Sequence, residues 1–292
     1  MIRFYFAIVI CFFLVSCASQ RSILPDVLDE VSGVECFSRS YCFAVNDSGD
    51  GPIVYVMTPE GVVFHHIYVN GAKNVDWEDL SCDDQFLYLG DIGNNSNKRK
   101  DLKIYRIPIS DVWSHSHIDG HLTHNFPDTV QASSFSFFYQ DQKGFPPSAE
   151  VFNFDAESIA SANGKLLILS KDRSKPYRGT CKIYEGEFSP GKLKLKLFQQ
   201  INFKGVSWLK GSVTGCDYKD GKLYVLTYKR VFVLERENGA FKIIGKKNLG
   251  FLQQWEGISV ESTNLVRIVA EKSRLGKQKM KTIQLRDFKA WN

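Results

Sequence analysis

Glu78-Asp79-Leu80-Ser81, followed after a turn by Leu87-Tyr88-Leu89-Gly90-Asp91, is one copy of a pattern that occurs five times in the chain. Each copy has an acidic or small residue entering a short apolar run, a turn, and a second run that leads to a polar residue. The other copies are Ser32-Gly33-Val34 to Asp47, Glu157-Ser158-Ile159-Ala160 to Lys171, Thr214-Gly215-Cys216-Asp217 to Tyr228, and Glu256-Gly257-Ile258-Ser259 to Glu271. Repetition on this scale indicates β-sheets arranged radially around an axis.

The spacing of the repeats predicts the architecture. The first residues of the copies lie 46, 79, 57 and 42 residues apart, and a blade of four antiparallel strands needs about 40–50 residues. We therefore predict an all-β fold, a single β-propeller with five blades, and an insertion at about 110–140 in the longest interval. Six blades are the alternative. The last copy lacks a fourth strand, which the segment Ile23–Leu28 could supply to close the ring.

The first residues predict export. Arg3 precedes an apolar run from Phe4 to Val15, which is too short to span a membrane and is typical of a signal peptide. Leu14-Val15-Ser16-Cys17 resembles the lipobox of bacterial lipoproteins, which implies a signal peptide at 1–16, lipidation of Cys17 and a propeller domain at 17–292. Because no Asp follows Cys17, we expect a lipid anchor in the outer membrane. An ordinary secretory signal or an uncleaved anchor is the alternative.

Charge is divided unevenly along the chain. Residues 17–159 contain 9 Lys and Arg against 21 Asp and Glu, whereas residues 160–292 contain 27 against 11. In a closed ring this division predicts one acidic side and one basic side. Export argues against nucleic acid, so the expected partners are the membrane, through the lipid, and a protein, a glycan or an anionic envelope component.

Five cysteines remain if Cys11 is removed with the signal peptide and Cys17 is lipidated. Cys36 and Cys42 flank a loop of hairpin length, which allows a disulfide in an oxidising compartment. A pair of buried free thiols is the alternative. The chain has no CxxC motif, which argues against a zinc ribbon or a thiol-redox site.

Several longer motifs resemble those of a family of exported bacterial β-propeller lipoproteins that is loosely grouped with phytase-like propellers. They are Ser32-Gly33-Val34, Asn46-Asp47-Ser48-Gly49-Asp50, Asp76-Trp77-Glu78-Asp79-Leu80, Gly90-Asp91-Ile92-Gly93-Asn94-Asn95, Asp155-Ala156-Glu157-Ser158-Ile159 and Val213-Thr214-Gly215. The resemblance covers most of the mature chain. It implies the fold, but it implies little about the activity.

Candidate site residues follow from the repeat. In a propeller the innermost strands and their loops surround a central funnel, where ligands and metals collect. The positions expected there are Ser32, Glu78, Asp79, Glu157, Thr214 and Glu256 from the first strands, and Asp47, Asp91, Lys171, Tyr228 and Glu271 from the ends of the second. Crowded carboxylates would have raised pKa values or would bind a cation. With Asn94 and Asn95 nearby, oxygen ligands of this kind suit Ca²⁺. The alternative is structural, with each repeated Glu accepting backbone N–H groups of the next blade.

Two further segments contain candidate metal ligands. The acidic spacing in the run from Asn46 to Gly51 does not fit an EF-hand, so we expect a glycine-rich turn. His115 and His117 alternate, as on one face of a strand, and their spacing would suit zinc or copper. They lie in the insertion, where an exposed polar hairpin is the favoured interpretation.

Three functions are compatible with these residues. The favoured one is a lipoprotein whose propeller is a binding or scaffold module in the cell envelope. The second is a Ca²⁺-dependent phosphoesterase in which Lys171 and Arg173 hold phosphate. The third is a glycan-active hydrolase that uses two funnel carboxylates about 5–5.5 Å or 6.5–9.5 Å apart. The chain has no GxSxG elbow and no Walker or Rossmann phosphate loop.

Overall fold

The computed structural model describes residues 21–36, 40–118, 121–203, 207–250, 253–261, 264–274 and 276–291. Cys17 and the predicted signal peptide lie outside these residues. Within them, no helix is long and apolar enough to cross a membrane.

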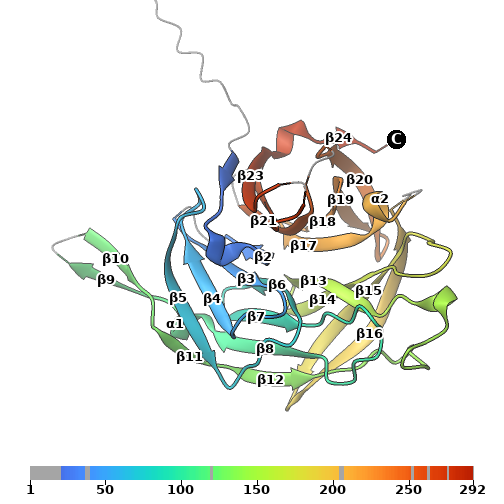
Figure 1. The fold of residues 1–292 in the computed structure, drawn as a ribbon, viewed down its shortest axis with the longest axis horizontal. Helices are drawn as coiled ribbons and strands as arrows, with labels where there is room; N and C mark the ends of the chain where they lie inside the picture. The colour runs from blue at the N-terminus through green and yellow to red at the C-terminus, as the bar shows by residue number, and fades with distance from the viewer. Residues whose placement is uncertain are drawn as a thin grey trace, which may run out of the picture.

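Five almost fully buried strands form the innermost layer. They are β2 (Val31–Glu35), β6 (Trp77–Cys82), β13 (Asp155–Ala162), β17 (Val213–Lys219) and β21 (Trp255–Glu261). Each of these strands contacts the next, and β21 contacts β2, so that they close a ring (Figure 1). They coincide with the first strands of the five sequence repeats. The predicted all-β propeller is therefore confirmed.

The first sheet begins with β2 and continues outward through antiparallel strands. These are β3 (Cys42–Asn46), β4 (Ile53–Met57) and β5 (Val63–Asn70). A short segment of the insertion, β11 (Thr129–Gln131), pairs in parallel with the end of β5.

The next two sets of four strands share one eight-stranded sheet. One set is β6, β7 (Phe86–Asp91), β8 (Lys103–Pro108) and β12 (Ser133–Ser136), and the other is β13, β14 (Lys165–Lys171), β15 (Thr180–Ser189) and β16 (Lys192–Asn202). They join where Ser136 of β12 pairs in parallel with Lys192 of β16. Because two sets share a sheet, the ring contains four large sheets in the described residues, and our count of five blades stays a prediction.

The last two sheets complete the ring. One contains β17, β18 (Lys222–Thr227), β19 (Arg230–Glu237), β20 (Ala240–Asn248) and β24 (Lys289–Ala290), and the other contains β21, β22 (Leu265–Ala270), β23 (Lys279–Gln284) and β1 (Arg21–Ile23). β1 therefore supplies the outer strand of the last sheet, as predicted, but it lies earlier than expected. Asp26–Leu28 forms the 3-10 helix η1 instead.

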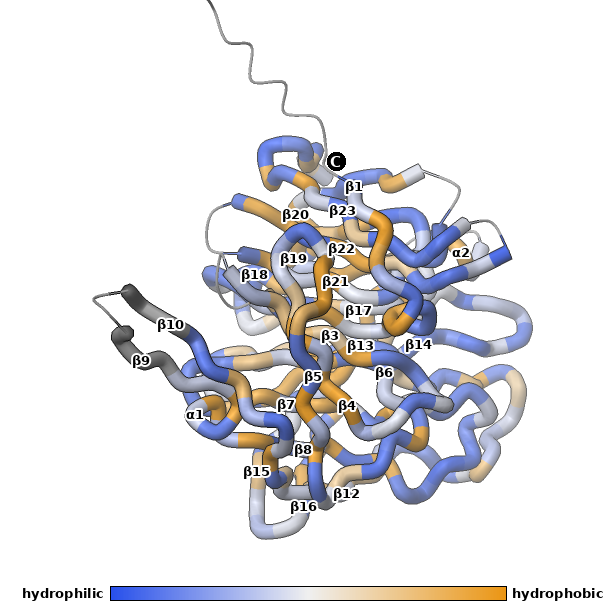
Figure 2. The backbone as a smooth tube through the Cα atoms, turned by 60° about the vertical axis from the view of Figure 1, so that its left-hand side comes forward, coloured by the Kyte–Doolittle hydropathy of each residue, from blue (hydrophilic) through white to orange (hydrophobic). Residues whose placement is uncertain are grey.

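The insertion contributes strands as well as loops. After the short helix α1 (Ile109–Val112), the hairpin of β9 (Ser114–Ile118) and β10 (His121–Asn125) projects from the ring (Figures 1 and 2). β11 and β12 then extend two different sheets. The remaining short helices are η2 (Ala149–Val151), α2 (Trp208–Gly211) and η3 (Leu285–Asp287).

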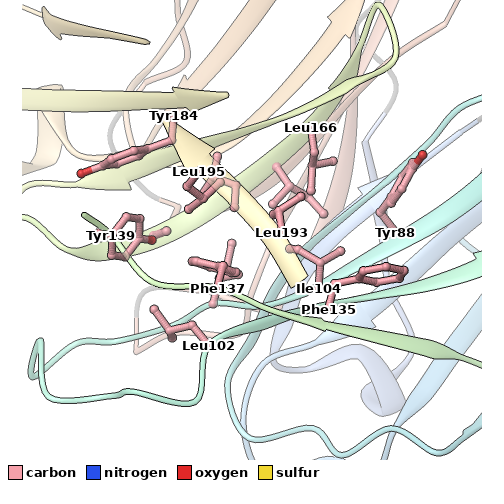
Figure 3. Packing of buried hydrophobic residues seen from close by; sticks show 14 of the residues in the cluster. Tyr88, Leu102, Ile104, Phe135, Phe137, Tyr139, Leu166, Tyr184, Leu193 and Leu195 are labelled. Carbon is pink, nitrogen blue, oxygen red and sulfur yellow. The ribbon is translucent and has the colours of Figure 1, made fainter. Parts of the chain in front are cut away.

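Apolar side chains fill the spaces between neighbouring sets of strands. Figure 3 shows one such cluster, in which Ile104 and Phe135 from one half of the eight-stranded sheet lie near Leu166 and Leu193 from the other half. Burial of this apolar surface, at about 25 cal/mol per Å², is the main stabilising contribution.

Candidate functional site: an acidic funnel

A β-bulge occurs at the same place in all five inner strands. The pairing with the second strand skips one residue in each case, and the skipped residues are Ser32, Glu78, Glu157, Thr214 and Glu256. A bulge leaves its extra residue unpaired and redirects its side chain. All five first-strand positions that the repeat identified as equivalent are therefore bulge residues.

The two short bulge residues connect neighbouring inner strands. The Ser32 hydroxyl donates to the Trp77 carbonyl at 3.0 Å, and the Thr214 hydroxyl donates to the Trp255 carbonyl at 2.7 Å. The three glutamates are longer, and their carboxylates interact with the charges at the end of the ring where the inner strands begin.

The second strands bring their ends to this same site. Because first and second strands are antiparallel, Asp155 pairs with Lys171 and Trp77 pairs with Asp91. We call the resulting charged cluster the funnel. Its residues are Asp47, Asp76, Glu78, Asp91, Arg99, Asp155, Glu157, Lys171, Arg173, Tyr228, Glu256 and Glu271.

One side of the funnel is internally paired. Lys171 Nζ lies 2.7 Å from Glu157 Oε2 and donates to the Tyr228 hydroxyl at 2.9 Å. Arg173 pairs with Asp155 through Nε, and its Nη2 lies 3.2 Å from Glu157 Oε1. These two cations are thus already neutralised by carboxylates.

Arg99 pairs with a second part of the funnel. Its Nη2 lies 2.9 Å from Asp91 Oδ1, and its Nη1 donates to the Gly93 carbonyl at 2.9 Å. Asp91 Oδ2 is buried and has no hydrogen-bond partner among the described residues. The loop after β7 therefore fixes a cation beside Asp91.

The other side of the funnel is a cluster of three carboxylates. Oxygen atoms of Asp47, Asp76 and Glu78 lie within 4.8 Å of one another. Glu78 is only 6% exposed, and in the described part of the chain its carboxylate has no hydrogen bond or ion pair. A Cβ at Gly93 would overlap with Asp76 Oδ2 and Glu78 Oε1, so the absent side chain leaves room for these carboxylates.

Burial and mutual repulsion raise the pKa values of this cluster. Burial, followed by the charge of Asp47, raises the pKa of Asp76 to about 7. Burial and the charges of Glu157 and Asp47 raise the pKa of Glu78 well above its usual range. Burial and the charge of Glu30 raise the pKa of Glu271 to about 7. Such a cluster either retains protons or binds a cation.

The donor set of Asp47, Asp76 and Glu78 fits Ca²⁺. All three residues supply oxygen, and Ca²⁺ accepts six to eight oxygen ligands in flexible geometries. A second group, Glu78, Asp155 and Glu157, also has oxygens within 4.8 Å of one another. In this second group, Asp155 and Glu157 already form ion pairs with Arg173 and Lys171. The first group is therefore the better cation site.

The two asparagines expected near the ligand set have different surroundings. Asn94 does not supply an oxygen to the cluster, because its Oδ1 accepts from the Arg99 backbone N–H and its Nδ2 donates to the Phe154 carbonyl. Asn95 is exposed. Both residues belong to the loop that positions Arg99.

The expected placement of Asp79 in the funnel is corrected, because Asp79 lies between inner strands. Its carboxylate accepts the backbone N–H groups of Leu80 and of Ile159 on the neighbouring inner strand. Asp217 does the same with Tyr218 and Val260. The structural role that we considered for the repeated glutamates is therefore carried by aspartates one or three positions later in the repeat. The bulge at Glu78 turns the two neighbouring acids to different surroundings.

The other candidate segments have simpler roles. In the turn from Asn46 to Gly51, Asp50 accepts from Asn46, Gly51 and the Tyr55 hydroxyl, as a structured turn requires. His115 and His117 lie on β9, and their side chains are outside the described residues. Cys36 and Cys42 form a disulfide, whereas Cys82, Cys181 and Cys216 are free.

Sequence reasoning did not assign Asp76, Asp155, Arg99 or Gly93 to the site. Asp76 and Asp155 each lie two positions before a bulge glutamate, in motifs that were visible in the sequence. The signal that could have identified them is this shared spacing. Arg99 and Gly93 carry no such periodic signal.

Comparisons with known proteins bear on the fold. No protein-family model matches the chain, and no curated protein matches it. The structure is similar to the glutaminyl cyclase of Myxococcus xanthus, with 12% identity over 94% of this chain and 96% of that chain and a TM-score of 0.50. It is also similar to a putative glucose dehydrogenase of Thermus thermophilus, with 8% identity over 91% of this chain and 100% of that chain and a TM-score of 0.47. A streptogramin B lyase has 9% identity over 91% of this chain and 97% of that chain, with a TM-score of 0.44. At these identities the likeness to the cyclase supports the propeller-like fold alone.

Proposed function

We propose that this protein is a lipid-anchored binding module of the bacterial cell envelope, and that its funnel binds Ca²⁺ through Asp47, Asp76 and Glu78. The observation that supports this proposal is the buried, unpartnered carboxylate of Glu78 beside two further carboxylates. Three acidic groups would neutralise the ion and leave coordination positions for a ligand. Asp47 and Asp76 are partly exposed, so the cation would be reached from the mouth of the funnel.

The pairing of the cations supports binding over phosphoryl chemistry. A phosphoesterase needs free cationic side chains to hold phosphate. Lys171 and Arg173, the residues considered for that role, are both engaged by carboxylates. A ligand with carboxylate, hydroxyl or carbonyl oxygens would instead complete the coordination shell of the bound ion.

A glycan-active hydrolase is the second candidate, and one observation favours it. Glu78 and Glu157 have oxygens within 4.8 Å of each other, close to the 5–5.5 Å separation of retaining enzymes. Glu157 forms ion pairs with Lys171 and Arg173, whereas Glu78 forms none among the described residues. The two cations favour the ionised form of Glu157, and their absence favours the neutral form of Glu78, which is the division of roles that an acid and a nucleophile need. Release of reducing sugar from envelope glycans, abolished in Glu78→Gln, would establish this candidate.

The proposal is tested on the purified full-length lipoprotein in detergent. We expect thermal unfolding to move to higher temperature with Ca²⁺ and to return with a chelator, because a ligand at 100 times its Kd stabilises by about 2.7 kcal/mol. Asp76→Asn should reduce the shift strongly, and exposed Asp84→Asn should leave it unchanged. A Ca²⁺-independent melting temperature would contradict the cation site. Mass spectrometry of the mature amino terminus tests the anchor, which requires a lipidated Cys17.

A further inference from the structure

Strand β1 is the first described strand of the domain, and in the sequence it follows shortly after Cys17, the proposed point of lipid attachment. It pairs with β23 at the outer edge of the last sheet (Figure 1). Arg21, its first residue, is four positions after Cys17, and an extended chain spans at most about 3.6 Å per residue. If Cys17 is lipidated, as the proposed function holds, this edge of the ring lies within about 14 Å of the lipid.

The edge is basic. Arg21 pairs directly across from Lys281, and Ile23 pairs across from Lys279, so these four side chains share one face of the strand pair. In the described part of the chain, Arg21 and Lys279 form no ion pair or hydrogen bond through their side chains, whereas Lys281 is only 7% exposed and is influenced by the charge of Asp287. Like charges directly opposite each other are destabilising unless an anion compensates them.

Further basic residues extend this surface. Lys277 is exposed just before β23, and the charge of Lys247 on the neighbouring sheet acts on Lys281. Lys247 itself lies 3.6 Å from Asp287, whose charge also acts on the buried Lys281. Among the described residues, the exposed or half-buried cations of this edge without an ion pair are therefore Arg21, Lys277 and Lys279. Figure 2 shows β1 and β23 together at one end of the molecule.

Exposed apolar side chains lie on the same edge. Ile23 is 66% exposed, and Val62, which follows a turn packed against β1, is 60% exposed. The turn packs so closely against the amino-terminal segment that a Cβ at Gly61 would meet Leu24 and the Ser22 hydroxyl. Surfaces that bind in the headgroup region of a bilayer commonly combine exposed aliphatic side chains with basic ones.

We propose that the edge formed by Arg21, Ile23, Val62, Lys277 and Lys279 docks on the anionic headgroups of the membrane that holds the anchor. This proposal rests on the lipid attachment in the proposed function and is independent of the cation site. The lipid tethers the chain, and the basic edge fixes its orientation. Because β1 lies at the rim of the ring, the funnel axis then runs along the membrane plane, and the mouth opens sideways.

The test uses the mature chain carrying Cys17→Ser, so that no lipid contributes to binding. Cosedimentation is measured in chelator with vesicles of phosphatidylcholine alone or with 30% phosphatidylglycerol. We expect binding to the anionic vesicles that falls as salt is raised, and at least tenfold weaker binding to the neutral ones. Lys277→Ala with Lys279→Ala should weaken binding about 25-fold, because each basic residue contributes about fivefold.

The matched control is Lys192→Ala with Lys194→Ala, two exposed lysines on the outer strand of another sheet. This pair should change binding less than twofold. Equal binding to both kinds of vesicle, or an equal loss in the control pair, would overturn the proposal. Its failure is distinct from failure of the anchor, because lipidation is read from the mass of the wild-type amino terminus.

Discussion

Lys171 Nζ lies 2.7 Å from Glu157 Oε2, and both side chains are only 7% exposed. The pair joins the end of a second strand to a bulge residue of the first strand in the same set. It divides the funnel into a side that is internally neutralised and a side, around Glu78, that is not. Most of the expected behaviour of the protein follows from this division.

Removing the lysine should destabilise the domain. Lys171→Met leaves Glu157 with Arg173 as its remaining cation, and breaking a buried pair costs about 3–5 kcal/mol. We expect a loss of about 3 kcal/mol in the free energy of unfolding, measured by urea titration. Lys165→Met breaks a pair with Glu185 in which the lysine side chain is 41% exposed, and it should cost less than about 1 kcal/mol. Equal losses in the two variants would argue against a buried pair.

Asp79 should contribute to stability and not to cation binding. Asp79→Ala removes the acceptor for two buried backbone N–H groups, those of Leu80 and Ile159. We expect unfolding to become easier by about 2–3 kcal/mol, while the Ca²⁺-induced shift in melting temperature is retained. Exposed Asp84→Ala is the control and should stay within about 0.5 kcal/mol of the wild type. A loss of the Ca²⁺ response in Asp79→Ala would place this residue back in the site.

Gly93 should be required for the acidic cluster. Gly93→Ala places a methyl group where Asp76 and Glu78 now have their oxygens, so the carboxylates must separate. We expect at least tenfold weaker Ca²⁺ binding by isothermal titration. Gly51→Ala is the matched control, because a Cβ there meets only Ile53 at ordinary contact distance. If the Gly93 variant binds Ca²⁺ as the wild type does, the ion lies elsewhere.

The metal-free protein should lose stability as the pH rises from about 4 to about 7. The pKa of Asp76 is raised to about 7 by burial and by Asp47, so the folded state binds more protons than the unfolded state below that pH. Stability is therefore greatest in acid and declines as the folded carboxyl group ionises. Asp76→Asn should make the decline shallower by up to about 1.4 kcal/mol per pH unit. Urea titrations at several pH values in chelator measure this slope, and an unchanged slope in the variant would be inconsistent with a raised pKa at Asp76.

The sequence predicted the inner ring well because its signals are local. The apolar runs after Glu78 and Glu256, and the turns that follow them, specify strands without reference to distant residues. The amino-terminal closure was also accessible, because an incomplete last repeat requires an extra strand. The strands of the insertion were harder to place, since β11 and β12 are short and their partners, β5 and β8, belong to two different sheets.

The chemistry of the site could be predicted only in part. The repeat identified the positions of Glu78, Glu157 and Glu256, but it could not show the bulge that redirects them. A bulge depends on pairing between strands, and a shift of one residue reverses which face a side chain occupies. This is why Asp79 was grouped with Glu78 although it bonds the next inner strand. The ion pair of Arg173 with Asp155 could not be predicted from the sequence either, because it depends on the conformation of the loop that follows β14.

Calcium binding is the most direct test of the account. Isothermal titration of the chelator-treated lipoprotein at pH 5 and pH 8 should show one Ca²⁺ per chain, bound more tightly at pH 8 because the carboxyl groups of Asp76 and Glu78 must lose their protons. Asp47→Asn and Asp76→Asn should each weaken binding at least tenfold, and Asp84→Asn should not. A protein that binds no Ca²⁺ at either pH, or binds it equally well without Asp47 and Asp76, would contradict the proposed cation site.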